Sequence, residues 1–455
     1  MIMPINKDTC TRTLATPIGE RAYKIVETLS DAGFDTWWVG GCVRDMLQGH
    51  VPTDIDIATA ATPEQVSTLF KRSKEEGTRF GSVRILLGND VFEITTFRED
   101  DDASDGRHPE AVSFGTREQD AKRRDFTVNA MYWHPISREL YDPCFGEGDL
   151  KERLIRFIGE PAIRIKHDAL RILRAVRFRA RLDGQYHPET YTALREQAGM
   201  ISILSGSRLL EETEKMLAGP HPDRAFEDLW ELGILKLFLP ELADCKGIPQ
   251  PADYHHEGDV WDHTLQVIRS FREEDTADAR LAALFHDCGK VQTFSLKERI
   301  RFDHHATISA DLATAALQRL QCSRKRIEKI DWLVRHHMSM TFLEMPDERK
   351  GHWYFHPWFN ELLQLFWLDI AGTSPQDFTL YERIVADFHR FLDGHPRPEK
   401  PLLTGNEVME ILGIHSGEQV GKILKELHGA QIQKKITSKQ DAKEFVKKKN
   451  HEAGN

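Results

Sequence analysis

The chain has 455 residues, of which 40% are hydrophobic and 29% charged, and its formal net charge is −11. This length predicts two to four domains of roughly 100–200 residues each. A membrane protein is excluded, because no apolar run approaches the ~18 residues that a span needs and the N-terminal segment lacks the apolar core of a secretory signal. Six scattered cysteines without a CxxC pair favour reduced thiols in the cytoplasm over disulfides or a zinc site.

The first 150 residues alternate between helical and strand patterns. Apolar residues at helical spacing predict helices at 19–33, from about 43, and at 62–70, where Thr62 is the expected cap. Alternating and β-rich runs predict four strands, the last two joined by a hairpin-type turn: 35–40, 54–59, 82–88 and 91–97. This part of the chain is therefore predicted to be mixed α/β.

After residue 150 the pattern is helical almost to the end. Proline-rich stretches at 240–251 and 394–401 indicate boundaries between domains. The segment 151–181 is strongly basic, and the tail at 422–449 is rich in lysine, which predicts a short helix or a frayed end. A basic middle in an acidic chain can form a local groove for RNA phosphates.

Two short motifs in the mixed part carry chemistry, GGCVRD at 40–45 and DIDI at 54–57. Gly40 and Gly41, between a strand and a helix, let backbone N–H groups approach a triphosphate. Asp54 and Asp56 alternate on a strand and so face the same side, where they can hold two Mg²⁺ ions, with Glu93 as a third candidate ligand. Alone, each motif predicts only a turn or a solvated strand edge; together they predict nucleotidyl transfer.

Five further segments resemble, in order, the motifs of the polymerase-β-like nucleotidyltransferases, in the class II form shared by tRNA CCA-adding enzymes and bacterial poly(A) polymerases. The resemblance covers about residues 20–240. The segments are TTFREDDDASDGRHPEAVSFG at 95–115, RRDFTVNAM at 123–131, DPCFGEGDL at 142–150, HDALRILRAVRFRARL at 167–182 and SRLLEETEKML at 207–217.

The resemblance implies roles at the sugar and phosphates of the nucleotide. The segment 123–131 is similar to the one that selects the ribose, so Asp125 is expected to accept from a ribose hydroxyl and Asn129 to bond the sugar or backbone. Arg124 is expected to contact phosphate, and Arg44 is counted with the nucleotide-binding residues.

The resemblance also implies a protein template for the incoming base. Asp168 and Arg171, three apart on a predicted helix, would meet the Watson–Crick edges of C and A, while Arg174 and Arg177 suit phosphate. Without the family context, the first pair predicts only a surface ion pair. One departure is His167, where the family usually has Glu.

Histidine and aspartate recur through the second half in the order of an HD domain, a helical fold that clusters these residues around a metal. We expect His263, His286, Asp287 and Asp369 to bind a divalent transition metal or Mg²⁺, since imidazole and carboxylate ligands suit such ions. His305, His336 and His337 belong to the same pattern, and Lys290 could meet a phosphate. Ala306 stands where relatives often have Glu.

The prediction for the whole chain is an α+β nucleotidyltransferase head with a mixed sheet and helices, followed by an all-α neck and an all-α HD domain. The expected bounds are 1–150 for the head, 151–245 for the neck that binds RNA and nucleotide bases, 246–395 for the HD domain and 396–455 for a helical tail.

The expected function is template-independent addition of CMP and AMP, from CTP and ATP, to the 3′ end of tRNA, in the cytoplasm and without a membrane or DNA partner. One alternative is a poly(A) polymerase or A-adding enzyme of the same family. Another is an HD phosphohydrolase with an inactive RNA-binding head, against which the intact Asp54 and Asp56 count. The loop residues 105–109 speak against a CC-only enzyme, because such enzymes resemble the family with that loop shortened.

Overall fold

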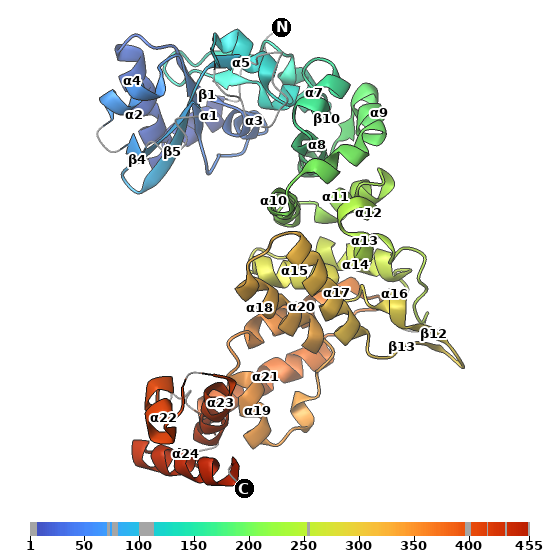
Figure 1. Cartoon of the computed structure of the whole chain (residues 1–455). Coiled ribbons are helices and arrows are strands. Elements are labelled where there is room, and N and C mark those ends of the chain that lie inside the picture. Colours follow the sequence, from blue (N-terminus) through green and yellow to red (C-terminus); the bar gives the residue numbers. More distant parts are fainter. Residues whose placement is uncertain are drawn as a thin grey trace. The chain divides into compact units, whose positions relative to one another are not determined.

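The structure, a computed structural model shown in Figure 1, forms two compact units, Met1–Phe238 and Leu239–Asn455. It describes residues 7–70, 73–74, 81–99, 113–252, 255–395, 402–415, 417–432 and 435–453. The loop residues 105–109 lie outside these ranges. Within them, no helix has both the length and the apolar character required to cross a membrane.

A mixed seven-stranded sheet, in the order β3-β4-β5-β2-β1-β8-β9, organises the N-terminal part of the first unit. β1 pairs antiparallel with β2, with Val39 opposite Asp56, and β2 pairs parallel with β5, with Ile57 opposite Ile94. This register brings the end of β1 and the segment around Asp56 and Glu93 to one region of the sheet. The strands are β1 (Thr36–Val39), β2 (Asp56–Thr59), β3 (Ser73–Lys74), β4 (Ser82–Leu87), β5 (Asp90–Thr96), β8 (Tyr132–Trp133) and β9 (Leu140–Tyr141).

The predicted strands and helices of this part are present, with shifted ends. The helix expected at 19–33 begins at Pro17, because the Thr16 side chain caps it by accepting from the Gly19 N–H. Thr62 caps the helix predicted at 62–70 in a capping box with Gln65, as expected. The helices are α1 (Lys7–Leu14), α2 (Pro17–Asp31), α3 (Gly41–Leu47), α4 (Pro63–Leu69), α5 (Arg117–Arg123) and α6 (Gly146–Lys151). The short pair β6 (Arg98–Glu99) and β7 (Ser113–Phe114) lies apart from the main sheet.

The rest of the first unit is helical except for one parallel pair, β10 (Leu154–Ile155) and β11 (Gln185–Tyr186). α8 is amphipathic and buries Ile172, Leu173 and Val176, and both α10 and α11 pack against it. The helices are η2 (Thr127–Asn129), α7 (Pro161–His167), α8 (Leu170–Leu182), α9 (Pro188–Glu196), η3 (Ala198–Ile203), α10 (Gly206–Leu217), α11 (Pro222–Glu231) and α12 (Leu235–Phe238).

Over its described residues, the second unit is a helical bundle with one small hairpin, β12 (Phe294–Leu296) and β13 (Ile300–Phe302). α14, α15, α17, α18 and α20 pack on one another and bury apolar side chains such as Leu281, Leu284 and Leu333. The helices are α13 (Pro240–Ala243), α14 (Val260–Arg269), α15 (Ala277–Phe285), α16 (Lys290–Thr293), α17 (His305–Arg319), α18 (Arg324–His336), η4 (Phe342–Glu344), α19 (Asp347–Tyr354), α20 (Phe359–Gly372) and α21 (Thr379–Gly394).

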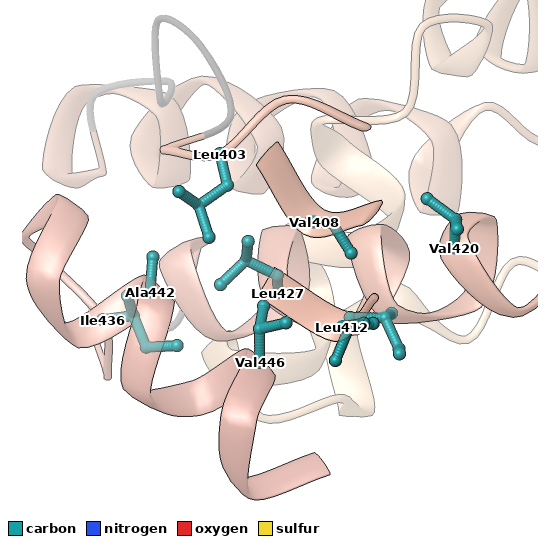
Figure 2. Packing of buried hydrophobic residues seen from close by; sticks show 9 residues of the cluster. Leu403, Val408, Leu412, Val420, Leu427, Ile436, Ala442 and Val446 are labelled. Atoms are coloured by element: carbon teal, nitrogen blue, oxygen red, sulfur yellow. The ribbon is translucent and has the colours of Figure 1, made fainter. Parts of the chain in front are cut away.

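The lysine-rich end of the chain is a helix packed into a small core, and it is not frayed over the residues described. α22 (Gly405–Leu412), α23 (Glu418–Ile432) and α24 (Lys439–Ala453) pack on one another. Figure 2 shows Ala442 and Val446 of α24 facing Leu427 of α23, and all three side chains are fully buried. The apolar residues between the lysines therefore determine this structure.

Candidate active site and a second metal-ligand cluster

Three carboxylates gather near the start of β2. Asp54 and Asp56 are both exposed and flank the buried Ile55, so they project to the same side, although the strand itself begins only at Asp56. The pKa of Asp56 is raised to about 6, first by the loss of water around its carboxylate and then by the negative charges of Asp54 and Glu93. The three side chains predicted as metal ligands are thus close enough to repel one another, which a divalent cation would relieve.

A glycine turn adjoins these carboxylates where β1 ends. Gly40 has φ of 75°, in the left-handed region where a residue with a Cβ is strained, and its N–H donates to the Met131 carbonyl. A Cβ built on Gly40 would lie 3.6 Å from the Arg124 guanidinium, so this arginine faces the turn. The turn therefore combines close backbone approach with a cation, which is the requirement for binding phosphate.

A buried chain of hydrogen bonds joins four of the predicted nucleotide residues. The Arg44 guanidinium donates to Asn129 Oδ1 at 2.6 Å, and Asn129 Nδ2 donates to Asp125 Oδ1 at 3.1 Å. Arg174 Nε donates to the other oxygen of Asp125 at 2.7 Å. Burial raises the pKa of Asp125, but the Arg174 charge and the hydrogen bonds from Arg174, Asn129 and the Phe126 N–H together lower it below its ordinary value. This series of hydrogen bonds connects α3 to α8, and the lowered pKa keeps Asp125 ionised.

Asp120 is a component of this site that the sequence analysis missed. It is fully buried and accepts from Arg123, Arg124 and Tyr132. Burial alone would raise its pKa, but the two guanidinium groups lower it to about 2. The signal was present in the sequence, because Asp120 precedes the two arginines by three and four residues, the spacing of neighbours on a helix.

The predicted pairing of Asp168 with Arg171 on one helix face is wrong. The helix ends at His167, and Asp168 lies in the break before α8, with φ of −153°. Its carboxylate accepts from the Leu170 N–H and forms an ion pair with Arg208 at 3.6 Å, while Arg171 donates to the Arg164 carbonyl at 2.8 Å. The Asp168 carboxylate thereby satisfies the N–H of the first residue of α8, one of the groups that a helix start leaves without a carbonyl partner.

Arg177 also has a partner that the sequence analysis did not assign. Its Nε donates to Glu212 of α10 at 2.8 Å, and Glu212 accepts from Lys215 at 3.2 Å. The predicted phosphate ligands Arg174 and Arg177 are therefore each tied to a carboxylate in this structure, which fixes their positions along α8.

The second unit gathers histidine and aspartate side chains from five helices or their ends. All four predicted ligands are there: His263 Nε2 lies 3.1 Å from Asp369 Oδ1 and 3.2 Å from His286 Nε2, and His286 Nε2 lies 3.3 Å from Asp287 Oδ2. The ligand atoms of His263, His286 and Asp369 all lie within 4.8 Å of one another.

A second group consists of His305, His337 and Asp287, and it adjoins the first because Asp287 Oδ2 also contacts His286 Nε2. The other carboxylate oxygen of Asp287 lies 3.4 Å from His305 Nε2, which in turn is 3.3 Å from His337 Nε2. His305 and His337 were recognised in the sequence pattern but not placed in the predicted ligand set. His336 was also in that pattern, yet its ring packs against Trp332 and Trp353 instead.

Backbone and carboxylate acceptors orient the imidazoles of this cluster. The Nδ1 atoms of His286, His305 and His337 lie 2.6–2.9 Å from carbonyl oxygens three residues earlier in the chain, so each Nε2 is left facing the centre. The Nδ1 of His263 meets Glu257 at 3.0 Å in the same way. This orientation is the one that metal-binding histidines adopt.

Three family models match consecutive parts of the chain. Residues 36–156 match the family model of the Poly A polymerase head domain, 185–246 match the probable RNA and SrmB-binding site of polymerase A, and 254–391 match the HD domain. The chain is 32% identical over 433 residues to the CC-adding tRNA nucleotidyltransferase of Thermus thermophilus, and this alignment covers 90% of the chain and 93% of the relative. The chain belongs to the tRNA nucleotidyltransferase and poly(A) polymerase family.

Other relatives of this nucleotidyltransferase match in part or in fold. The CCA-adding enzyme of Geobacillus stearothermophilus is 40% identical over 228 residues, so the alignment covers 50% of this chain and only about half of the relative, 56%. The crystal structure of the Bacillus stearothermophilus CCA-adding enzyme in complex with CTP superposes with a TM-score of 0.64 at 24% identity, covering 96% of this chain and 99% of that one. This likeness confirms the fold.

The donor atoms of this nucleotidyltransferase fit divalent cations at two places. Membership of the family implies dependence on a divalent metal, and the head offers carboxylate oxygens alone, which suits a hard cation. The HD domain offers imidazoles and carboxylates together, which suits a transition metal. Among the residues described, the groups whose ligand atoms lie within 4.8 Å of one another are all in the second unit.

Proposed function

We propose that this enzyme adds CMP and AMP, from CTP and ATP, to the 3′ end of tRNA, as CCA addition or repair in the cytoplasm. The observation that carries the proposal is the grouping of three carboxylates beside a glycine turn that faces Arg124. Family membership and the relatives that add C or CCA support the same reaction. All six cysteines are free thiols, which agrees with a reducing compartment.

In this proposal Asp54, Asp56 and Glu93 hold two Mg²⁺ ions. Bound Mg²⁺ supplies activation of the attacking 3′-hydroxyl and neutralisation of charge on the leaving pyrophosphate. The backbone at Gly40 and Gly41 accommodates the triphosphate. This assignment requires Asp56 to be ionised, so metal binding competes with the protonation that its raised pKa favours.

Residues of the helical part hold the sugar and base. We assign Asp125 and Asn129 to the ribose, and the buried network that joins their polar atoms to Arg44 supports a common role. Arg124, Arg174 and Arg177 supply positive charge for phosphates. Asp168 and Arg171 remain our proposed readers of the base, with Arg208 now in contact with the former. His167, in place of the family Glu, ends α7 just before them.

The proposed organisation retains a head at 1–150, a neck at 151–245, an HD domain at 246–395 and a tail at 396–455. The head lies wholly within the first compact unit, and the neck does so up to Phe238. This supports treating the two segments as one catalytic body.

The test offers tRNA lacking CCA, lacking only A, or complete, with CTP, ATP or both, and reads product lengths on a gel. Addition of two C and one A followed by arrest is the expected result. Arrest after two C would instead indicate a CC-adding enzyme, like the Thermus relative, and long A tails would indicate poly(A) synthesis. Asp54→Ala should abolish every addition. Nucleotide addition by this variant would show that the metal assignment is wrong.

A second candidate activity is phosphoester hydrolysis in the HD domain. The convergence of imidazoles and carboxylates favours it, with Asp287 lying 3.3 Å from His286 Nε2 through one oxygen and 3.4 Å from His305 Nε2 through the other. The probe is an RNA ending in a 2′,3′-cyclic phosphate or a phosphomonoester, incubated with Mn²⁺, Ni²⁺ or Mg²⁺. Asp287→Asn should remove this activity and spare nucleotide addition, whereas Asp54→Ala should do the reverse. If neither substrate is hydrolysed with any of the three metals, the second unit is structural.

A further inference from the structure

The imidazoles of the metal-ligand cluster in the second unit are oriented in two different ways. His286, His305 and His337 each direct Nδ1 to a main-chain carbonyl, whereas His263 directs Nδ1 to the carboxylate of Glu257 at 3.0 Å. A main-chain carbonyl is present whatever the side chains are, but a carboxylate is lost when its residue changes. The orientation of His263 therefore depends on one side chain, to which the predicted ligand set gives no role.

The Glu257 carboxylate is buried, and both of its oxygens accept hydrogen bonds. Its side chain is only 3% exposed, Oε1 lies 2.6 Å from His255 Nδ1 and 3.0 Å from His263 Nδ1, and Oε2 accepts from the Ser374 N–H at 2.8 Å. Burial raises the pKa of Glu257, but the hydrogen bonds to it lower the pKa to about 2. Because an ionised carboxylate can only accept, both Nδ1 atoms carry a proton.

The contact with Ser374 reaches the helix that carries a second ligand of the same group. Asp369 lies in the last turn of α20, and Ser374 follows the end of that helix. The Ser374 carbonyl also accepts from the His256 N–H at 2.9 Å. Gly372 packs so closely on α14 that a Cβ there would overlap Val267. Glu257 therefore lies at the junction of α14 and α20, two helices that supply ligands to one metal group.

His263 has a carboxylate at each of its ring nitrogens. Glu257 faces Nδ1, and Asp369 Oδ1 lies 3.1 Å from Nε2. A neutral imidazole carries one proton, and a metal ion needs the lone pair of Nε2, so the proton must then be on Nδ1. An anion at Nδ1 stabilises the N–H there. Without it the proton can move to Nε2 and be donated to Asp369, and two ligand atoms are then occupied at once.

We propose that Glu257 is a positioning residue of this metal centre, which fixes the tautomer of His263 and the place of α20 and thereby raises the affinity of the group for a divalent transition metal. Partners of this kind, one shell outside the ligands, change metal affinity by roughly 10–100-fold. The inference rests on the metal centre proposed for the second unit, and it depends neither on nucleotide addition nor on hydrolysis of an RNA end.

The test measures how tightly the full chain binds Ni²⁺, an ion that imidazole ligands suit. All variants carry Asp54→Ala, which removes a proposed metal ligand of the head. Glu257→Gln keeps the size of the side chain but replaces one acceptor oxygen by an NH₂ group, so at least one of its three donors loses its acceptor. Calorimetric titration should give a Kd roughly 10–100-fold higher than that of the parent. An unchanged Kd would overturn the proposal.

Two matched variants separate this effect from the loss of any buried charge or of the loop. Glu241→Gln removes another nearly buried carboxylate of the second unit, which is 12% exposed and accepts from Arg319. His255→Gln removes a donor to Glu257 and leaves His263 unchanged. Both should keep the Ni²⁺ Kd within about twofold of the parent. A loss in either variant as large as that in Glu257→Gln would overturn the specific role of Glu257.

Nitrogen NMR of the histidine rings gives a readout that a purely structural brace would not change. In the metal-free enzyme labelled with ¹⁵N-histidine, and with the ring neutral, the His263 signals should show the proton on Nδ1 in the parent and on Nε2 in Glu257→Gln. His263→Gln assigns these signals. A proton on Nδ1 in both would overturn the proposal. A parent that binds no Ni²⁺ would refute the metal centre itself, whereas binding that ignores Glu257→Gln refutes this inference alone.

Discussion

At the scale of the residue, the carboxylates near β2 repel one another, and Asp56 shows the effect in its pKa. Its pKa is about 6 when folded, against an ordinary 3.8, so the folded state binds the proton more tightly than the unfolded state. Ionised Asp56 therefore destabilises the fold. Its effect on the free energy of unfolding is zero below about pH 4, increases between pH 4 and 6, and reaches its full size above pH 6. A site that binds a cation has this property when the cation is missing.

Asp56→Asn should therefore stabilise the metal-free first unit at pH 8. The gain should be on the order of 1 kcal/mol, because solvent around the exposed Asp56 screens the repulsion. Hydrogen exchange of the β1 and β2 amides, followed after chelation, measures it. The gain should vanish at pH 4, and Mg²⁺ should stabilise the wild type more than the variant. An equal gain at both pH values would contradict the electrostatic origin.

Residue identities predicted this site better than spacing did. Asp54, Asp56 and Gly40 were named together because each motif combines a residue type with a place in a strand–turn–helix unit, and the structure brings these residues to one region of the sheet. The role of Asp168 stays a prediction, and its expected position beside Arg171 on one helix was wrong, because a periodic pattern does not reveal the break between α7 and α8.

At the scale of the element, α8 and α10 are held together by a buried ion pair. Glu212 is 2% exposed and accepts from Arg177, which is 15% exposed. Glu212→Ala should lower the free energy of unfolding of the first unit by about 2 kcal/mol, since it leaves a nearly buried guanidinium without its carboxylate. Hydrogen exchange of the α8 and α10 amides is the measurement.

The neighbouring Glu211 provides the control for that change. It pairs with Lys215 on the same helix, but its side chain is 63% exposed. Glu211→Ala should therefore cost less than about 0.5 kcal/mol. Similar decreases in the free energy of unfolding for the two variants would mean that the buried pair contributes nothing and that both changes act only through the helix propensity of α10.

Helical periodicity predicted most elements but not what they pack against. The lysine-rich tail was expected to be a short helix or a frayed end, and its packing could not be foreseen because the partners of Ala442 and Val446 lie on α22 and α23, far back in the sequence. Long-range partners likewise explain Glu212 and Asp45, whose roles depend on arginines that tertiary structure brings to them.

At the scale of the whole molecule, the two compact units carry separate metal chemistry. The first offers carboxylate oxygens, and the second offers imidazoles together with carboxylates. A metal that binds the folded HD cluster stabilises the second unit by mass action, and it leaves the first unit unchanged unless it also binds the carboxylates there.

Adding Mn²⁺ or Ni²⁺ after chelation should thus raise the unfolding temperature of the second unit by roughly 5–10 °C when the metal is at about a hundred times its Kd. Hydrogen exchange of α15 and α17 during a temperature series assigns the shift to this unit. Asp287→Asn should lose most of the increment, because this carboxylate contacts a histidine of each ligand group. His336→Gln should keep it, because that ring packs against tryptophans although it adjoins His337. A full increment in Asp287→Asn would show that the metal binds elsewhere.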